Sequence, residues 1–134
     1  MYVQIVAWDL SRSAATVQTM RSYLREYAVD AYSRLEGMRL KVWFGNAEKQ
    51  VWGAVYLWDS VPHMQAVARV TRAIDLIGYP PTSVSVFEVE AISEGLSAHG
   101  LLAGLGQALT TAPEPAPTMD GSSGIQETIT GGKK

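Results

Sequence analysis

One stretch, residues 37–59, constrains the fold of this chain more than any other. It reads GMRLKVWFGNAEKQVWGAVYLWD, two strongly apolar β-type runs separated by a short polar turn at Gly45 to Gln50. Apolar and aromatic runs on either side of such a turn are typical of a β-hairpin. We therefore expect these residues to supply the middle of a sheet and most of any functional site.

The pairing of the two runs can be tested on the sequence, because side chains alternate between two faces along a strand. A pairing of Trp43 with Trp52 separates the residues cleanly and adds a cross-strand aromatic contact of roughly 0.5 kcal/mol. One face then carries Met38, Leu40, Val42, Phe44, Val51, Val55 and Leu57, with Gly53 as a gap. The other face carries Arg39, Lys41, Trp43, Trp52, Ala54, Tyr56 and Trp58.

Neither predicted face of this hairpin is polar. A two-layer α+β domain covers one sheet face with helices and normally leaves the other face polar and solvated. A large apolar face marks an interaction surface, and a second copy of the same sheet is its simplest cover. The sequence therefore predicts a homodimer built sheet to sheet.

The residues before the hairpin predict a strand and a helix. Residues 2–8 (YVQIVAW) are β-branched and aromatic, as in a strand. Residues 14–35 carry apolar side chains at helical spacing, and Gly37 is expected to end that helix. Three side chains offer oxygens for its N-cap: Asp9, Ser11 and Ser13.

The residues after the hairpin predict a second helix and a last strand. Ser60 suits an N-cap and Pro62 suits a first turn, so we expect a helix from there to about Ile77, ended at Gly78. Its inward side chains are expected to be Met64, Val67, Ala68, Thr71, Ile74 and Ile77. Residues 82–91 (TSVSVFEVEA) predict a strand whose alternation changes phase after Val86, which suggests a bulge or a crossing from one sheet to another.

The resulting order β-α-β-β-α-β predicts the ferredoxin-like α+β class, an antiparallel sheet with two helices on one face and strands 1 and 3 in the centre. This domain is expected over residues 1–92. Residues 93–109 contain leucines but also several glycines, so they predict a weakly helical extension. Residues 110–134 are rich in Pro, Gly, Ser and Thr and predict a disordered tail.

Composition narrows the classes of function. The chain has 134 residues, a formal net charge of -2 and no cysteine. Without a basic stripe we expect no nucleic-acid partner, and without cysteine there are no disulfides or thiolate sites. The start, MYVQIVAWDL, has no basic leader and only a short apolar run, so we expect neither a signal peptide nor a membrane span, and a cytoplasmic location by default.

The hairpin also resembles a known family. Gly37, Lys41-Val42-Trp43, Gly53 and Tyr56-Leu57, with Val86-Phe87-Glu88-Val89 in the last strand, are similar to the pattern of the YdhR-type monooxygenase-like proteins. The resemblance covers roughly residues 1–97 and implies a dimeric α+β barrel of the antibiotic biosynthesis monooxygenase-like superfamily. That superfamily includes cofactor-independent oxygenases of anthrone-like polyketides, cyclases, isomerases and haem-degrading enzymes.

The candidate site residues are mostly aromatic. Their rings predict a flat pocket for a polycyclic substrate. The predicted substrate-binding residues are Tyr23, Tyr27, Trp43, Trp52, Tyr56 and Lys41. The catalytic candidates are His63, as a base near neutral pH, and Trp58. Core packing is the competing explanation for the rings, and a solvent-facing helix start is the competing explanation for His63.

Two functions follow as hypotheses. The first is a small oxygenase of secondary metabolism acting on an aromatic or polyketide-like compound, with a cyclase or isomerase of the same fold as its variant. It needs no metal or other cofactor, although reduced flavin and haem stay open. The second is a non-catalytic dimeric binding protein. A ligand-sized cavity touching Tyr23, Tyr27 and Trp58 would favour the enzyme, and a filled core would favour the binding protein.

Overall fold

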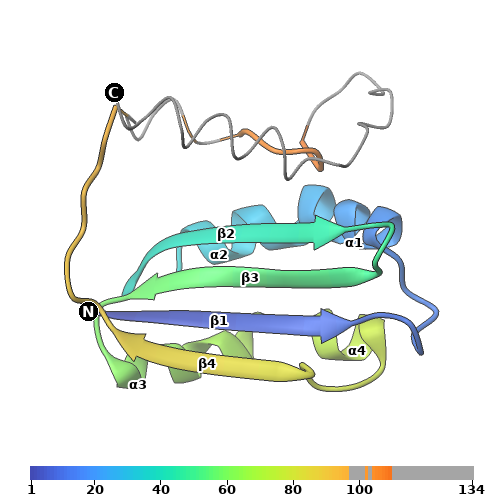
Figure 1. The fold of residues 1–134 in the computed structure, drawn as a ribbon, viewed down its shortest axis with the longest axis horizontal. Coiled ribbons are helices and arrows are strands. Elements are labelled where there is room, and N and C mark those ends of the chain that lie inside the picture. Colours follow the sequence, from blue (N-terminus) through green and yellow to red (C-terminus); the bar gives the residue numbers. More distant parts are fainter. Residues whose placement is uncertain (97–101, 103, 110–134) are drawn as a thin grey trace.

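The computed structural model describes residues 1–96, 102 and 104–109, and it is a four-stranded antiparallel sheet with helices on one side (Figure 1). The strands are β1 (Tyr2–Asp9), β2 (Met38–Asn46), β3 (Val51–Trp58) and β4 (Ser83–Glu88). Their order across the sheet is β2-β3-β1-β4. Strands 1 and 3 are therefore central, which confirms the predicted ferredoxin-like α+β class.

The first predicted helix is three consecutive pieces, α1 (Val17–Tyr23), a π-helical turn η1 (Leu24–Ala28) and α2 (Val29–Ser33). The N-cap is Thr16, so the prediction of Asp9, Ser11 or Ser13 was wrong. Thr16 Oγ1 accepts from the Thr19 backbone N–H at 3.1 Å, and Thr19 Oγ1 accepts from the Thr16 N–H at 2.8 Å. This reciprocal pair satisfies two donors that a helix start leaves unpaired.

The π turn changes which side chains face the sheet. Tyr23 and Ala28 are both buried although they are five residues apart, and Tyr32 follows four residues later at 1% exposure. An α-helix would bring residues three or four apart to one face, so the extra residue of the π turn is what aligns these three. The helix ends at Ser33, and Gly37 (φ +84°) instead forms the turn into β2, which corrects the prediction that Gly37 ends the helix.

The hairpin register differs from the prediction by two residues. Trp43 lies opposite Ala54, and Trp52 lies opposite Gly45. The predicted Trp43–Trp52 pairing would leave a two-residue turn, whereas the strands are joined by the four residues 47–50. Asn46 Oδ1 accepts from the Lys49 N–H at 2.9 Å, and Gln50 has a positive φ of 56°. A shift of two preserves the faces, so both predicted sets stay together apart from the two residues at the start of β2.

A β-bulge at Arg39 breaks that alternation at the start of β2. Met38 therefore pairs with Trp58 and packs against the core, and Arg39 makes an exposed ion pair with Asp59 at 2.7 Å. Arg39 was predicted to share a face with Lys41. The bulge removes it from that face.

The second predicted helix is also broken, into α3 (Val61–Met64), a 3₁₀ turn η2 (Gln65–Arg69) and α4 (Ala73–Ile77). Val67, Val70 and Thr71 are β-branched and lower helix propensity, and Thr71 Oγ1 accepts from the Ala73 N–H at 3.3 Å in place of a helical bond. Because the helix restarts there, Ala73 is buried. Ile74, predicted to face inward, is 41% exposed.

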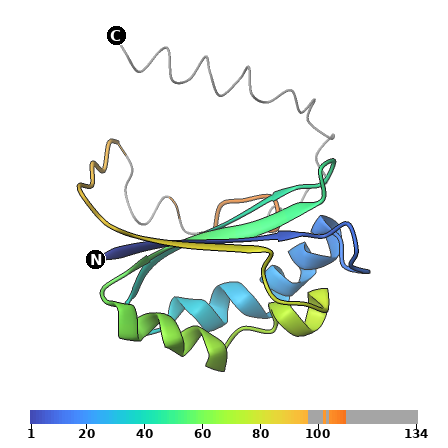
Figure 2. The same cartoon turned by 60° about the horizontal axis from the view of Figure 1, so that its bottom comes forward.

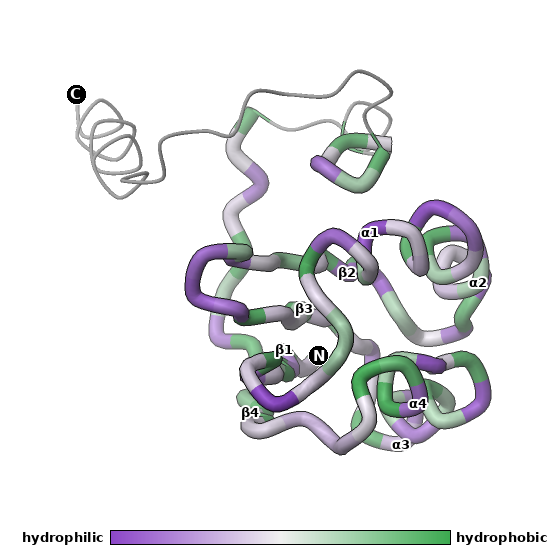
Figure 3. Tube along the Cα trace, turned by 90° about the vertical axis from the view of Figure 1, so that its right-hand side faces the viewer, coloured by the Kyte–Doolittle hydropathy of each residue, from purple (hydrophilic) through white to green (hydrophobic). Residues whose placement is uncertain are grey.

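Helices α1 to α4 lie on one face of the sheet, as Figures 2 and 3 show from two directions. We call this the helix-covered face, and its core includes Trp8, Trp52, Ala54, Tyr56 and Trp58. The other face, the open face, carries Leu40, Val42 and Phe44 at 48%, 49% and 36% exposure. On the open face the Phe44 ring lies over Gly53, where an added Cβ would be 2.5 Å from the ring. The predicted gap at Gly53 is thus filled from the neighbouring strand.

The fourth strand shows no bulge. Its register with β1 is regular from Ser83 to Glu88, so the predicted change of phase after Val86 was wrong. Val84 and Val86 face the helix side, opposite Val6 and Gln4, yet they are 54% and 45% exposed. The broken second helix leaves this edge of the sheet uncovered.

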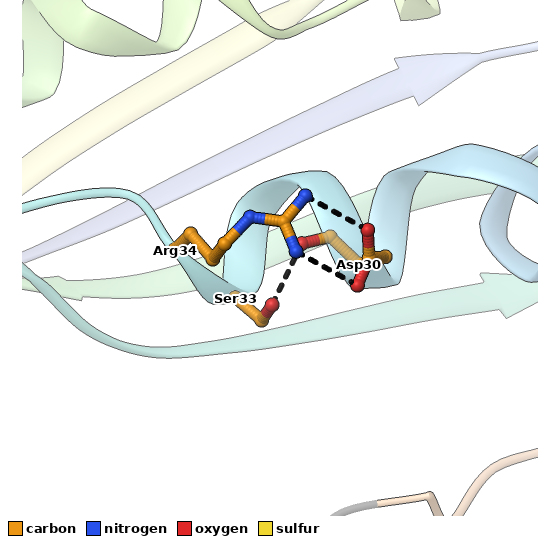
Figure 4. A network of polar contacts seen from close by, with 3 residues as sticks. All are labelled: Asp30, Ser33 and Arg34. Carbon is orange, nitrogen blue, oxygen red and sulfur yellow. Dashed lines mark hydrogen bonds and ion pairs between the residues drawn. The ribbon is translucent and has the colours of Figure 1, made fainter.

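The exposed side of α2 carries an ion pair between Asp30 and Arg34 at 2.9 Å (Figure 4). With both side chains about three-quarters exposed, this i,i+4 pair contributes roughly 0.3–0.5 kcal/mol.

The segment after the sheet contacts the first helix, because Arg25 Nη1 donates to the Ala108 carbonyl at 3.2 Å, and Ala108 is buried. The predicted disordered tail at 110–134 lies outside the described residues, as do 97–101 and 103 of the predicted extension.

Candidate functional site

Lys41 lies on the edge strand β2 and points its side chain into the helix-covered face. Its Nζ lies 3.4 Å from the ring centroid of Tyr32, 4.3 Å from that of Tyr56 and 4.4 Å from that of Trp43. Nζ also donates a hydrogen bond to the Tyr56 hydroxyl at 2.7 Å. We call the rings of Tyr32, Trp43 and Tyr56 the aromatic cage.

Burial controls the charge of this lysine. It lowers the pKa of Lys41 from 10.5 to about 6, because the described residues place no carboxylate beside the amine to offset the loss of water. The ring faces act in the opposite direction, by roughly 0.5–2 kcal/mol for each contact. The net direction we infer is a pKa below the ordinary value, so a larger fraction of this amine is neutral at pH 7 than of an exposed lysine.

The tyrosines of the cage are held neutral as well. Burial raises the pKa of Tyr32 to about 12. Burial, and then the neighbouring Tyr32, also raise the pKa of Tyr56 above its ordinary range. The site thus combines a neutral amine with neutral phenols, which can donate and accept hydrogen bonds without a net charge.

A small cavity of about 20 Å³ lies beside the Lys41 amine, and we call it the Lys41 pocket. Its lining residues are Val6, Trp8, Tyr23, Tyr32, Lys41, Trp43, Trp52, Gly53, Ala54, Tyr56, Thr71 and Ala73. The volume is enough for about one water molecule. Five of the predicted substrate-binding residues therefore come together here, but around a space far smaller than a polycyclic compound.

Tyr27, the sixth predicted binding residue, does not line the pocket. Its hydroxyl donates to the Val70 carbonyl at 2.8 Å, and its ring stacks on Tyr23 with centroids 5.9 Å apart. The Arg72 guanidinium lies 3.9 Å from the Tyr27 ring, and the Arg72 backbone N–H donates to the Tyr23 hydroxyl at 3.2 Å. These contacts fasten residues 70–72 over the pocket.

Trp58, a predicted catalytic residue, lies next to the pocket but not in its lining. It is fully buried, stacks on Tyr56 with centroids 5.2 Å apart, and donates from Nε1 to Gln4 Oε1 at 3.0 Å. Its one polar group is therefore occupied, and its ring supports that of Tyr56 from behind.

His63, the other predicted catalytic residue, lies in a different place. It lines a groove of about 390 Å³ with Leu35, Glu36, Pro62, Gln65, Ala66 and Arg69, which shares no residue with the Lys41 pocket. Nδ1 of His63 is 2.8 Å from Ser60 Oγ, and the ring packs against Gly37, where a Cβ would be 2.1 Å from its Cγ. The structure thus separates the predicted base from the predicted binding residues.

The sequence did not single out Tyr32 or Thr71 as site residues. The π turn that rotates Tyr32 inward has no simple sequence pattern, so helical spacing could not place this ring in the cage. A lysine on an otherwise aromatic strand face was the signal that could have found the cage, since such an amine needs partners.

Among the described residues, no three His, Asp or Glu side chains lie close enough together to hold a metal ion. In the same part of the chain, no helix has the length and apolar character needed to cross a membrane.

No protein-family model matches the chain, and no curated protein matches it. Solved structures similar to it include two that are each described as a "putative antibiotic biosynthesis monooxygenase". The one from Deinococcus radiodurans has a TM-score of 0.46 and 17% identity, over 69% of this chain and 97% of that one. The one from Chloroflexus aurantiacus has a TM-score of 0.46 and 18% identity, over 70% and 98%. The expected resemblance is thus found among solved structures, while the fold assignment rests on the strand order and register given above.

Proposed function

We propose that this chain is a small enzyme in which the Lys41 amine removes a proton from an aromatic, polyketide-like compound with an acidic C–H or phenolic O–H. The observation that carries this proposal is the position of the Lys41 amine, 2.7 Å from the Tyr56 hydroxyl and inside the aromatic cage, where burial lowers its pKa. A general base works best when its pKa lies near the working pH, and burial is how a lysine reaches that range.

We assign the role of general base to Lys41 and not to His63, the residue that the sequence predicted. His63 lies in the separate groove with Ser60, whereas Lys41 adjoins most of the aromatic side chains predicted to bind the substrate. A flat substrate stacked on the cage rings would bring its acidic hydrogen to the amine.

The chemistry after proton removal has two branches. In the oxygenase branch the carbanion reacts with O₂, and an activated methylene group becomes a ketone with release of one water, so that one oxygen atom enters the product and one leaves as water. In the cyclase or isomerase branch the same carbanion attacks a carbonyl or is protonated elsewhere, without O₂.

Substrate entry requires the pocket to open. The pocket holds about 20 Å³, so residues 70–72 must move away from Tyr23 and Tyr27, to which they are joined by two hydrogen bonds. Few buried side chains come from this part of the chain, as expected of a segment that opens locally at low cost.

A non-catalytic binding protein is the second candidate, and the small volume of the pocket favours it. In that case the cage rings serve packing alone, and Lys41 is held by Tyr56 without any exchange of protons with a ligand.

Sheet-to-sheet dimerisation belongs to both candidates. Leu40, Val42 and Phe44 are 36–49% exposed on the open face, and Phe87 is 56% exposed on the same face. A contiguous apolar patch of this kind is typical of an interface, and a second copy of the sheet matches its shape.

Hydrogen–deuterium exchange of a model substrate tests the enzyme proposal. Anthrone in D₂O at pH 7 should exchange its methylene protons faster with the protein than in buffer, and Lys41→Met should lose most of that acceleration. Lys49→Met, in the exposed turn, is the matched control and should keep it. Oxygen consumption then separates the two branches. No acceleration by the unmodified protein, for anthrone or for a panel of enolisable phenols, would favour the binding protein.

A further inference from the structure

The Lys41 amine has three properties that suit capture of a carbonyl compound. Burial lowers its pKa, it adjoins a cavity, and its nearest polar neighbour is a hydroxyl. Lys49, the other lysine of the hairpin, is exposed in the turn and has none of these surroundings. The two lysines therefore offer a comparison within one molecule.

An amine forms an imine with an aldehyde in two steps, and the cage suits both. The neutral nitrogen first adds to the carbonyl carbon, and the resulting carbinolamine then loses its hydroxyl as water. Tyr56 Oη, 2.7 Å from Nζ, is placed to donate a hydrogen bond to that departing oxygen. The iminium formed is a cation, and the ring faces at 3.4–4.4 Å attract positive charge.

We propose that Lys41 is a covalent binding site for small aldehydes, which its amine captures as an imine inside the aromatic cage. The step balances as R–NH₂ + R′–CHO → R–N=CH–R′ + H₂O, and no oxidant or reductant takes part. The closed cavity of about 20 Å³ holds about one water molecule, so only aldehydes of one or two carbons can enter with a small movement of its lining residues.

This binding goes beyond the proposed enzymatic activity and does not depend on it. Imine formation needs the amine, its neighbouring hydroxyl and room for one or two more atoms than the closed cavity holds, whereas turnover of an aromatic compound needs the pocket to open much further. A protein without turnover can therefore still capture an aldehyde, and the two failures are distinguishable.

Reductive trapping with acetaldehyde tests the proposal. The folded full-length chain is incubated at pH 7 with low millimolar acetaldehyde and cyanoborohydride, and N-ethylation of each lysine is followed by peptide mass spectrometry. Lys41 should be modified at least about ten-fold faster than Lys49, because a far larger fraction of its amine is neutral at this pH.

Two variants test the roles of the Tyr56 hydroxyl and the Lys41 amine. Tyr56→Phe keeps the ring and removes the hydroxyl, so it should slow modification of Lys41 several-fold and leave Lys49 unchanged. Lys41→Arg should abolish the fast modification while Lys49 is modified as before. Modification of Lys41 no faster than Lys49, or its appearance only in urea, would overturn the proposal.

Discussion

Lys41 illustrates how one residue can be partly buried without a carboxylate partner. The edge strand β2 keeps its backbone near solvent, and the side chain carries the amine inward to one hydroxyl and three ring faces. These partners replace only part of the hydration that a full ammonium charge needs, and the lowered pKa is the consequence. A charge that is costly in the folded state makes stability depend on pH.

The sign of that dependence follows from linkage. The folded pKa of about 6 lies below the ordinary value of 10.5, so the unfolded chain binds more protons between these pH values, and the free energy of unfolding rises with pH. Relative to Lys41→Met, the unmodified protein should gain up to about 1.4 kcal/mol per pH unit between pH 7 and 9. Urea unfolding at several pH values measures this. Lys49→Met should give a difference that does not change with pH, and a flat difference for Lys41→Met would contradict the buried neutral amine.

Gly37 is a second residue whose identity is fixed by its surroundings. An alanine there combines a left-handed φ of +84° with a Cβ 2.1 Å from His63 Cγ, so Gly37→Ala should destabilise the protein by more than about 2 kcal/mol. Gly78→Ala is the matched control, because Gly78 has φ +104° and open space around it, and it should cost about 1 kcal/mol. Thermal and urea unfolding measure the loss of stability in each variant. Equal losses would show that the His63 contact is unimportant.

At the scale of elements, the sequence predicted the strands better than the helices. Period-2 alternation identified four strands and sorted the side chains of the hairpin into two faces, because a packed face leaves a direct mark on the sequence. The predicted hairpin register was wrong by two residues. The turn formed by Asn46 and Gln50 determines the register more strongly than a contact between Trp43 and Trp52 would. The helix predictions failed at the π turn, where the backbone bonds span five residues, and at Thr71, whose side chain accepts a bond in place of a helical one.

The alternation of side chains along the strands also predicted part of the site. Strand alternation placed Lys41, Trp43, Trp52 and Tyr56 on one face, and the structure brings these four to one pocket. His63 was placed by its closeness in sequence to Trp58, but α3 turns it toward Gly37 instead. Contacts between a helix and a strand depend on tertiary packing, which a single sequence does not encode locally.

The two helix starts make an element-scale prediction. Thr16 caps α1 through a reciprocal bond with Thr19, whereas Ser60 occupies the N-cap position of α3 without a capping bond and pairs with His63. Thr16→Ala should therefore cost about 1 kcal/mol, and Ser60→Ala less than about 0.5 kcal/mol. The free energy of unfolding in urea decides between them. A larger loss for Ser60→Ala would show that the capping geometry is assigned to the wrong helix.

At the scale of the whole molecule, the sheet has one face covered by helices and one face that is apolar and open. We expect this open face to be the dimer interface. Val42→Asp would place a charge from each copy in that interface and should weaken association at least about 100-fold, because a buried unpaired charge is costly. Sedimentation equilibrium measures the change.

Leu76→Asp is the matched control for this prediction. Leu76 is 50% exposed, as Val42 is 49% exposed, but it lies on α4 in the helical layer. It should leave the dimer intact. A single subunit at micromolar concentration for the unmodified protein would contradict the sheet-to-sheet arrangement.

The proposed chemistry of the Lys41 pocket depends on the charge of one nitrogen at neutral pH. NMR titration of the chain with ¹³C-labelled lysine, followed at the Lys41 Cε and assigned with Lys41→Arg, reports that charge directly. We predict a midpoint near pH 6, as burial lowers the pKa of Lys41 to about 6. A midpoint near the ordinary value of 10.5 would show an ammonium held by the cage, and Lys41 would then be neither the base nor the nucleophile at pH 7.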